Sequence, residues 1–270
     1  HRAPPKLVAI KTASGRSITC TDNHSFVTRI NNAVVPIKGK DLKVGDRIPV
    51  INSFFADSPL TTISIHEKIA GFGFVGDDGR LYGQSEHTKP IENTLKLNVL
   101  TGWYTGAYLA EGASRGTGVV ISNVNDNYVA NAKDFVTTIG LDWTDRRKQG
   151  EYGPGRDLIV NSSLLGKFIT MICGRGSDHK RVPEFAYSAP DEFVAGLLRG
   201  YFDGDGNFQV SRKMIRASSN SKELTDGVAL LLSRFRIFAY KTEDRKGQHW
   251  LLIPYKYAPQ FLSHIGSDID

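Results

Sequence analysis

The sequence predicts an α+β protein made of two related halves that follow a smaller all-β segment. Two stretches, YTGAYLAEG at 104–112 and LRGYFDGDG at 198–206, share one design. Each is an apolar helix with glycine at its third position, and each ends in a carboxylate followed by glycine. The carboxylates Glu111 and Asp205 recur with a spacing of 94 residues. A repeat present in only two divergent copies indicates a duplicated domain rather than a solenoid.

Hydrophobic periodicity and capping signals predict the elements of the first half. They are a strand-like run at 118–123, a helix at 126–139, extended runs through Trp143 and at 158–160, and a closing helix at 163–172. The second stretch is followed by the same order: a strand-like run at 208–217, a helix from the cap at 219–221 to Phe235, extended runs at 237–241 and 250–253, and a closing helix at 257–265. Each half therefore has the order α-β-β-α-β-β-α, over 99–189 and 190–270.

Composition narrows the class of partner. The chain has 270 residues, of which 40% are hydrophobic and 23% charged, and no apolar run is long enough to cross a membrane. The two cysteines, Cys20 and Cys173, argue against a disulfide framework or a structural zinc site and favour a reducing, cytoplasmic location. The net charge of +6 favours a polyanionic partner without proving one.

Small residues within the two stretches predict close helix packing. Gly106 and Ala110 lie four residues apart on one helical face, as do Gly200 and Gly204, so two helix backbones can approach closely there. The carboxylates that end the helices would then lie side by side, where repulsion is costly unless divalent cations neutralise it. The alternative is that the glycines only pack helices and the final Asp-Gly is only a helix-ending turn.

At these residues the chain resembles the LAGLIDADG, or dodecapeptide, homing endonucleases. The resemblance spans about 99–270 and implies two pseudo-symmetric units whose saddle-shaped antiparallel sheets contact double-stranded DNA. It also implies that Glu111 and Asp205 bind Mg²⁺ (or Mn²⁺) beside the scissile phosphates, in a monomer that recognises a long specific target. Lys180-Arg-Val-Pro183 is similar to a short block of the family, which makes Lys180 a candidate catalytic lysine. The alternative for Lys180 is an exposed basic residue in the cluster 179–181.

The implied chemistry is hydrolysis of phosphodiester bonds. A hard cation polarises the phosphate and acidifies a water molecule, so no side-chain nucleophile is needed. One carboxylate per half gives one cut per strand, and Lys180 would stabilise developing negative charge. The repeat spacing places any second-half counterpart of Lys180 beyond Asp270. Either the second site lacks that lysine or the sequence stops before it, and Lys246 is a weak substitute.

DNA contacts are expected on the strands and turns of both halves. Period-2 alternation places residues 211, 213 and 215 on one face and 212, 214 and 216 on the other, and it does not choose between the faces. The candidate phosphate or guanine contacts are Arg146, Arg147, Lys148, Arg212, Lys213, Arg216, Lys241, Arg245 and Lys246. The alternative for each is an ordinary solvated surface charge.

The N-terminal quarter carries a second resemblance. Residues 7–24 predict a hairpin that turns at Ser14-Gly15 and ends in Thr21-x-x-His24, and a turn at 41–46 leads into a strand at 47–51. This looks like part of a Hedgehog/intein-type splicing domain (1–51), in which Thr21 and His24 would polarise the scissile peptide. The splicing junctions are absent from the sequence, so self-splicing is not expected. Cys20 is expected to be a buried small residue in a strand.

Residues 52–98 match neither unit and are expected to be a connector or an accessory DNA-contacting segment. The run 71–76 has the glycine spacing of a dinucleotide-binding loop, but Asp77-Asp-Gly79 follows where a helix should begin, so a loop or hairpin is expected. The two resemblances together imply a site-specific DNA endonuclease within an intein, whose target is the host allele without the insert. The alternative is a nucleic-acid-binding protein of the same fold without nuclease activity, such as a maturase or an eroded intein insert.

Overall fold

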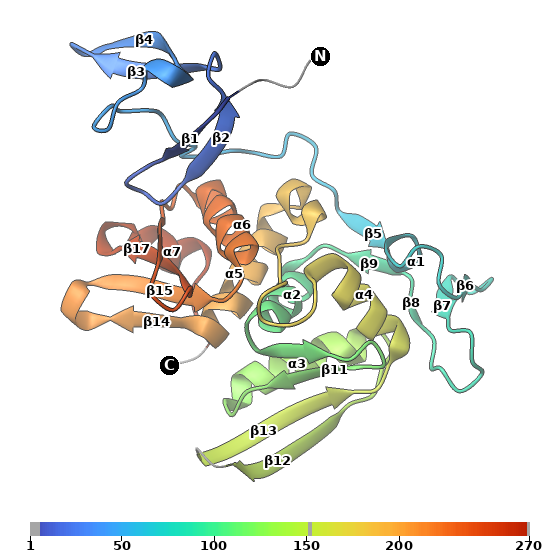
Figure 1. Cartoon of the computed structure of the whole chain (residues 1–270). Coiled ribbons are helices and arrows are strands. Elements are labelled where there is room, and N and C mark those ends of the chain that lie inside the picture. Colours follow the sequence, from blue (N-terminus) through green and yellow to red (C-terminus); the bar gives the residue numbers. More distant parts are fainter. Residues whose placement is uncertain (1–5, 151–152, 269–270) are drawn as a thin grey trace.

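A computed structural model describes residues 6–150 and 153–268 of the chain (Figure 1). The first half has the order α2 (Val99–Glu111), β10 (Gly112–Ser114), β11 (Val119–Ser122), α3 (Asp126–Thr138), β12 (Thr144–Gly150), β13 (Gly153–Val160) and α4 (Ser163–Cys173). The second half has the order α5 (Asp191–Asp205), β14 (Gly206–Gln209), β15 (Met214–Ser219), α6 (Lys222–Leu232), β16 (Tyr240–Glu243), β17 (His249–Pro254) and α7 (Ala258–His264). The element order matches the predicted duplication.

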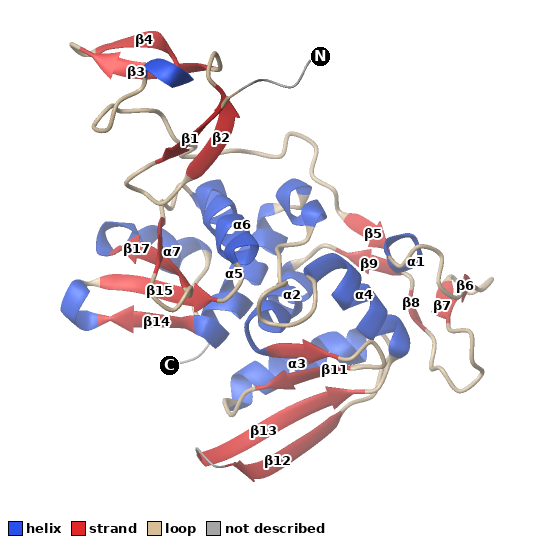
Figure 2. Cartoon of the chain, in the orientation of Figure 1, coloured by secondary structure: helices blue, strands red, loops and turns tan. Residues whose placement is uncertain are grey.

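Each half contains a four-stranded antiparallel sheet, and the strand orders correspond. The first sheet has the order β10-β11-β13-β12 and the second has the order β14-β15-β17-β16. One face of each sheet is covered by helices of its own half (Figure 2). The side chains on the covered faces are fully or almost fully buried, namely Val119, Ile121, Leu158 and Val160, and Ala217, Leu251 and Ile253. The opposite face of each sheet is called the open face below.

Side-chain caps explain where several helices begin. The side chains of Asn98, Asn125, Ser162 and Ser221 each accept a hydrogen bond from the backbone amide three residues later. Such a cap satisfies one of the amides that a helix start leaves unpaired. Among the described residues, no helix is long and apolar enough to cross a membrane.

The second half contains a turn that the alternation pattern does not anticipate. A 3-10 turn at Val210–Arg212 ends in Lys213, which has a left-handed backbone with φ of +50°. This turn separates β14 from β15, so the expected alternation through 211–216 is wrong before Met214. Arg212 and Lys213 therefore lie in the tip of a hairpin and not on a strand.

The N-terminal residues form two separate hairpins. The strands β1 (Leu7–Lys11) and β2 (Ser17–Thr21) pair as predicted, with Gly15 at a φ of +80° in the turn. The strands β3 (Ser25–Ile30) and β4 (Ala33–Lys38) form the other hairpin and are followed by a 3-10 turn at Gly39–Asp41.

Two expectations for this quarter are wrong. Residues 47–51 form no strand because no described strand pairs with them, although Thr28 Oγ1 donates a hydrogen bond to the Arg47 carbonyl oxygen at 2.9 Å. Cys20 is half-buried rather than buried, since a two-stranded hairpin leaves much of both faces uncovered.

Residues 52–98 form a small β-rich unit beside the first half (Figure 1). Its elements are β5 (Thr62–Ser64), α1 (Ile65–Lys68), β6 (Phe74–Val75), β7 (Arg80–Tyr82), β8 (Ile91–Glu92) and β9 (Thr94–Lys96). Its apolar side chains, including Ile65, Leu81 and Ile91, belong to the main hydrophobic core. The segment is therefore an integral part of the fold. The run 71–76 enters the β6–β7 hairpin, as expected from the aspartates that follow it.

Candidate active site and nucleic-acid interface

Helices α2 and α5 pack against each other at the centre of the molecule (Figure 1). A Cβ atom added at Gly106 would lie 2.0 Å from the carbonyl oxygen of Leu197 on α5. A Cβ atom added at Gly200 would lie 2.1 Å from the carbonyl oxygen of Trp103 on α2. The relation is reciprocal, as a pseudo-twofold axis requires. The two backbones touch, so no residue larger than glycine fits at either position.

The glycine seam extends one turn further than the sequence prediction. Gly102 and Gly196 make the same approach, with added Cβ atoms 2.0 Å and 2.2 Å from the carbonyl oxygens of Phe193 and Val99. At the other end, a Cβ atom at Gly204 would lie 2.5 Å from Cβ of Ala110. The structure thus brings together the four predicted interface residues. Their spacing of four residues, continued backwards, is the signal that identifies the two that were missed.

The seam ends at Glu111 and Asp205, the last residues of α2 and α5. Both side chains are half-buried, and a Cβ atom at Gly204 would lie 3.0 Å from Cγ of Glu111. Burial raises the pKa of Asp205 to about 6. Burial and the charge of Asp205 together raise the pKa of Glu111 to about 7. The two carboxylates are therefore close enough to repel each other when both are ionised.

Lys180 is buried beside this pair, with 7% of its surface exposed. Its Nζ donates a hydrogen bond to the carbonyl oxygen of Ala110 at 3.3 Å and lies 5.3 Å from the centre of the Tyr108 ring. Burial lowers the pKa of Lys180, while the charges of Asp205 and Glu111 oppose that change. The alternative of an exposed surface lysine is therefore wrong.

Two further residues at the seam were not singled out from the sequence. The Tyr128 hydroxyl donates to the carbonyl oxygen of Gly200 at 3.1 Å, and burial raises its pKa well above 10. Asp203 is 5% exposed and accepts hydrogen bonds from Ser267 Oγ at 2.6 Å and from the Asp268 amide at 3.1 Å. By the repeat spacing, Asp203 corresponds to Leu109, so this buried carboxylate distinguishes the second half from the first.

The chemistry of Glu111 and Asp205 fits a hard divalent cation. Burial is the main cause of their raised pKa values, so a nearby cation would favour their ionised forms. Carboxylate oxygens are the ligands that Mg²⁺ prefers. The described residues contain no cluster of three or more His, Cys, Asp or Glu side chains suited to a metal. Additional oxygen ligands would therefore have to come from backbone, water or a phosphate.

The open face of the first sheet carries two of its three predicted basic contacts. Arg146 and Lys148 lie two residues apart on this face, with Arg146 Nη2 3.9 Å and Lys148 Nζ 2.7 Å from Asp157 Oδ2. Arg147 lies on the opposite face, and its Nη2 is 3.5 Å from Asp126 Oδ1 at the start of α3. Alternation therefore separates Arg147 from its neighbours, so it does not share their open face.

The second sheet divides its candidates in the same way. Arg216 lies on the open face, because its neighbours Ile215 and Ala217 point toward the helices. Lys241 lies opposite the buried Leu251, where it pairs with Asp226 of α6 and is only 15% exposed. Lys241 therefore does not share the open face with Arg216. The exposed turns at the ends of the hairpins carry Arg212, Lys213, Arg245 and Lys246.

Thr21 is the last residue of β2 and His24 lies in the turn that follows, and both are exposed. The His24 amide donates a hydrogen bond to the Thr21 carbonyl oxygen at 3.1 Å. The His24 ring makes an edge contact with Phe26, with 5.0 Å between the ring centres. The structure thus places the two residues together, in the smaller N-terminal part of the chain.

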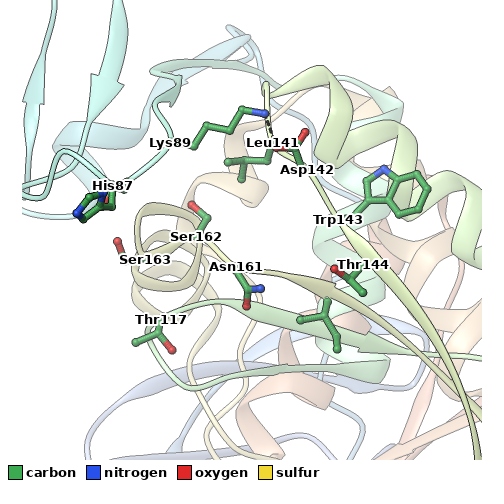
Figure 3. Close-up of a pocket in the computed structure, with 12 residues that line it drawn as sticks. His87, Lys89, Thr117, Leu141, Asp142, Trp143, Thr144, Asn161, Ser162 and Ser163 are labelled. Atoms are coloured by element: carbon green, nitrogen blue, oxygen red, sulfur yellow. Dashed lines mark hydrogen bonds and ion pairs between the residues drawn. The ribbon is translucent and has the colours of Figure 1, made fainter.

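A pocket of about 390 Å³ lies where the segment 52–98 meets the outer end of the first sheet (Figure 3). Thr144 and Ile159, which belong to the open face, line it together with His87 and Lys89. Lys89 Nζ pairs with Asp142 Oδ2 at 2.6 Å. The segment 52–98 therefore reaches the edge of the open face.

Comparison with known proteins assigns the second half of the chain to a family. The family model described as "LAGLIDADG-like domain" matches residues 192–266, a range that contains Asp205 and the whole second sheet. The chain carries a LAGLIDADG-like domain. This match confirms the predicted family resemblance for the motif that ends at Asp205.

Relatives of this chain carry various names. The DNA-directed RNA polymerase subunit Rpo1C of Methanocaldococcus jannaschii is 40% identical over 270 residues, which cover 100% of this chain and 31% of that protein. The probable translation initiation factor IF-2 of the same organism is 31% identical, over 89% of this chain and 24% of its own length. The DNA polymerase II large subunit of Thermococcus kodakarensis is 36% identical over 35% of this chain and 6% of its own length. The chain thus spans a third or less of these relatives.

Solved structures with a similar fold include I-DmoI in complex with DNA and Mn, with a TM-score of 0.49 and 14% identity over 63% of this chain and 97% of that one. Full-length DUF199/WhiA from Thermatoga maritima has a TM-score of 0.48 and 14% identity over 76% of this chain and 61% of that one. At this level of identity, neither likeness bears on the chemistry of the present chain.

Proposed function

We propose that the chain is a site-specific endonuclease that hydrolyses both strands of DNA with Mg²⁺ or Mn²⁺. The observation that carries the proposal is the pair of half-buried carboxylates, Glu111 and Asp205, at the ends of two helices whose backbones touch. A purely structural seam has no need for two like charges at one end, since they oppose the packing. A buried lysine beside the pair supports the same conclusion.

Glu111 and Asp205 would hold the cation together with phosphate oxygens of the DNA. When bound, the cation supplies polarisation of the phosphate and acidification of an attacking water. Lys180, whose Nζ lies between the helix end and the Tyr108 ring, would stabilise negative charge that develops on the phosphate oxygens. Each half contributes one carboxylate, so each would serve one strand.

The open faces of the two sheets are the proposed DNA-binding surface. They lie opposite the helix-covered faces, and both carry arginine or lysine side chains, represented by Arg146, Lys148 and Arg216. Basic groups on a surface that continues on both sides of the seam suit a duplex that crosses it. The turn residues Arg212, Lys213, Arg245 and Lys246 would contact phosphates at the flank of the second half.

We also propose that the endonuclease is part of an insert within a host protein. Relatives named as a polymerase subunit and an initiation factor share most or all of this chain, yet it covers no more than a third of either. A segment shared by proteins with such different names suits a mobile insert of the intein type. Residues 1–51 would belong to its splicing domain, with Thr21 and His24 at the splicing block, and the DNA target would be the host allele without the insert.

The test is cleavage of a plasmid library with a randomised insert, in Mg²⁺. Wild-type protein should cut a defined sequence on both strands, while Glu111→Gln and Asp205→Asn should still bind that sequence and lose cleavage. Glu192→Gln, which removes an exposed carboxylate from the same helix as Asp205, is the matched control and should cut normally. Specific binding by wild-type protein without cleavage would contradict the proposal and favour a protein of this fold without nuclease activity.

A further inference from the structure

The open faces of the two sheets carry different side chains at equivalent positions. In the first sheet, Val120 of β11 lies directly opposite Ala113, the second residue after Glu111. In the second sheet, Arg216 of β15 lies directly opposite Asn207, the second residue after Asp205. Arg216 therefore occupies in the second half the open-face position that Val120 occupies in the first.

Arg216 is held in place by two neighbours on its own face. Its Nε donates a hydrogen bond to Oδ1 of Asn207, the residue directly opposite on β14, at 2.7 Å. Its guanidinium carbon lies 5.0 Å from the centre of the Trp250 ring. The indole of Trp250 is fixed in turn, because its Nε1 donates to Asp244 Oδ2 at 3.3 Å. These contacts reduce the conformational entropy that Arg216 would lose on binding.

These contacts leave the terminal nitrogens of Arg216 available. None of the ion pairs formed by the described residues involves Arg216, whereas Arg146 and Lys148 of the first sheet both lie near Asp157. Because Asn207 occupies only Nε, the two Nη groups remain as a planar fork of donors. Guanine presents two acceptors, O6 and N7, at its major-groove edge, and this edge matches such a fork. Adenine and cytosine present an amino donor there, and thymine presents a methyl group beside one acceptor.

We propose that Arg216 reads a guanine base in the DNA major groove, with Asn207 and Trp250 as its positioning residues. This inference rests on the proposed DNA-cleaving function. Asn207 lies two residues after Asp205, which is ~7 Å along an extended strand. At 3.4 Å per step of one strand, the guanine lies about two or three base pairs from the cut in the second half-site. The equivalent position of the first half-site faces Val120, which has no donor for guanine, so the target departs from a palindrome there.

The test selects bound duplexes from a randomised library with wild-type protein, in Ca²⁺ instead of Mg²⁺, and then measures affinity for single-base variants. Wild-type protein should prefer guanine at one position by roughly 5- to 150-fold. Arg216→Ala should abolish that preference and leave the other positions unchanged. Arg216→Lys should weaken it, because a lysine cannot form the planar fork. Trp250→Leu keeps the arginine but removes its support, and should reduce the preference in part.

Arg212→Ala is the matched control, since Arg212 lies exposed in the neighbouring hairpin tip. It should weaken binding to all sequences alike and reduce the slope of log K against log salt by about 1. The inference is overturned if Arg216→Ala behaves in the same way, or if wild-type protein cleaves a defined site that shows no guanine at the sensitive position. A library that returns no preferred sequence would overturn the proposed site-specific function as well.

Discussion

Replacing Asp205 by asparagine should stabilise the metal-free protein at neutral and basic pH. The carboxylate lies half-buried at the end of the glycine seam, beside Glu111 and near Lys180. Asparagine has nearly the same shape and cannot ionise, so the change removes a charge and leaves the packing in place. A residue retained at a cost in stability is expected where function needs the charge.

The size of the effect follows from the pKa. Burial raises the pKa of Asp205 from 3.8 to about 6, and a shift of two units corresponds to ~3 kcal/mol. Because the side chain is only half-buried, water screens part of this penalty, and ~1–2 kcal/mol is the expected gain. Below about pH 4 the carboxyl group is neutral in both the folded and the unfolded chain, so it imposes no penalty. As the pH rises from about 4 to 6, the unfolded chain ionises first and the free energy of unfolding falls; above pH 6 the penalty is complete.

The assay is urea denaturation followed by circular dichroism in EDTA, at pH 4.5 and at pH 8. Asp205→Asn should be more stable than wild-type protein at pH 8, and the difference should shrink to about a third of that value at pH 4.5. Added Mg²⁺ should stabilise wild-type protein more than the variant, because only wild-type protein keeps both carboxylates. Glu192→Gln should show neither effect. The reasoning is refuted if Asp205→Asn is less stable than wild-type protein by the same amount at both pH values.

Three other changes test the rest of the arrangement. Gly200→Ala should lower the free energy of unfolding by about 3 kcal/mol or more, because the new Cβ would lie 2.1 Å from the carbonyl oxygen of Trp103. A denaturation midpoint like that of wild-type protein would contradict the close packing of the two helices. Lys180→Met should slow cleavage by about 10²-fold. It should also move the acidic limb of the pH–rate profile to higher pH, because Lys180 lowers the pKa of both carboxylates. An unmoved limb would argue against this role of Lys180. Arg16 of the first N-terminal hairpin contacts the second half through a hydrogen bond to the Ala239 carbonyl oxygen at 3.2 Å and a stacking contact with Phe238. Arg16→Ala removes both contacts, so protease should cut the N-terminal hairpins ~5-fold faster than in wild-type protein. Equal rates would show that these contacts do not hold the hairpins in place.

The sequence predicted the features that depend on spacing along one element. Four-residue spacing of small residues predicted the seam, and the matched carboxylates predicted which ends of the helices meet. The turn before β15 was not predictable, because Lys213 adopts a left-handed backbone that lysine seldom takes. The fold of 52–98 was also missed, since strands of two or three residues, such as β6, are too short to show a period.

Assigning the DNA-facing side chains required a different kind of information. Alternation correctly separates Arg146 from Arg147, but only the position of α3 shows which of them faces outward. Likewise, Lys241 is a basic candidate in the sequence. Its side chain lies on the helix-covered face, where it pairs with Asp226 of α6, fifteen residues earlier in the chain.

The seam and the open faces together explain why one chain can treat its two half-sites differently. The seam must remain symmetric, because at Gly102, Gly106, Gly196 and Gly200 each backbone excludes any side chain on the other. The other residues are under no such restriction, as Asp203 in place of Leu109 and Arg216 in place of Val120 show. Lys180 adds to this difference, since it reaches both carboxylates from the first half alone. Unequal rates of cutting of the two strands are therefore expected from the same geometry that holds the two carboxylates together.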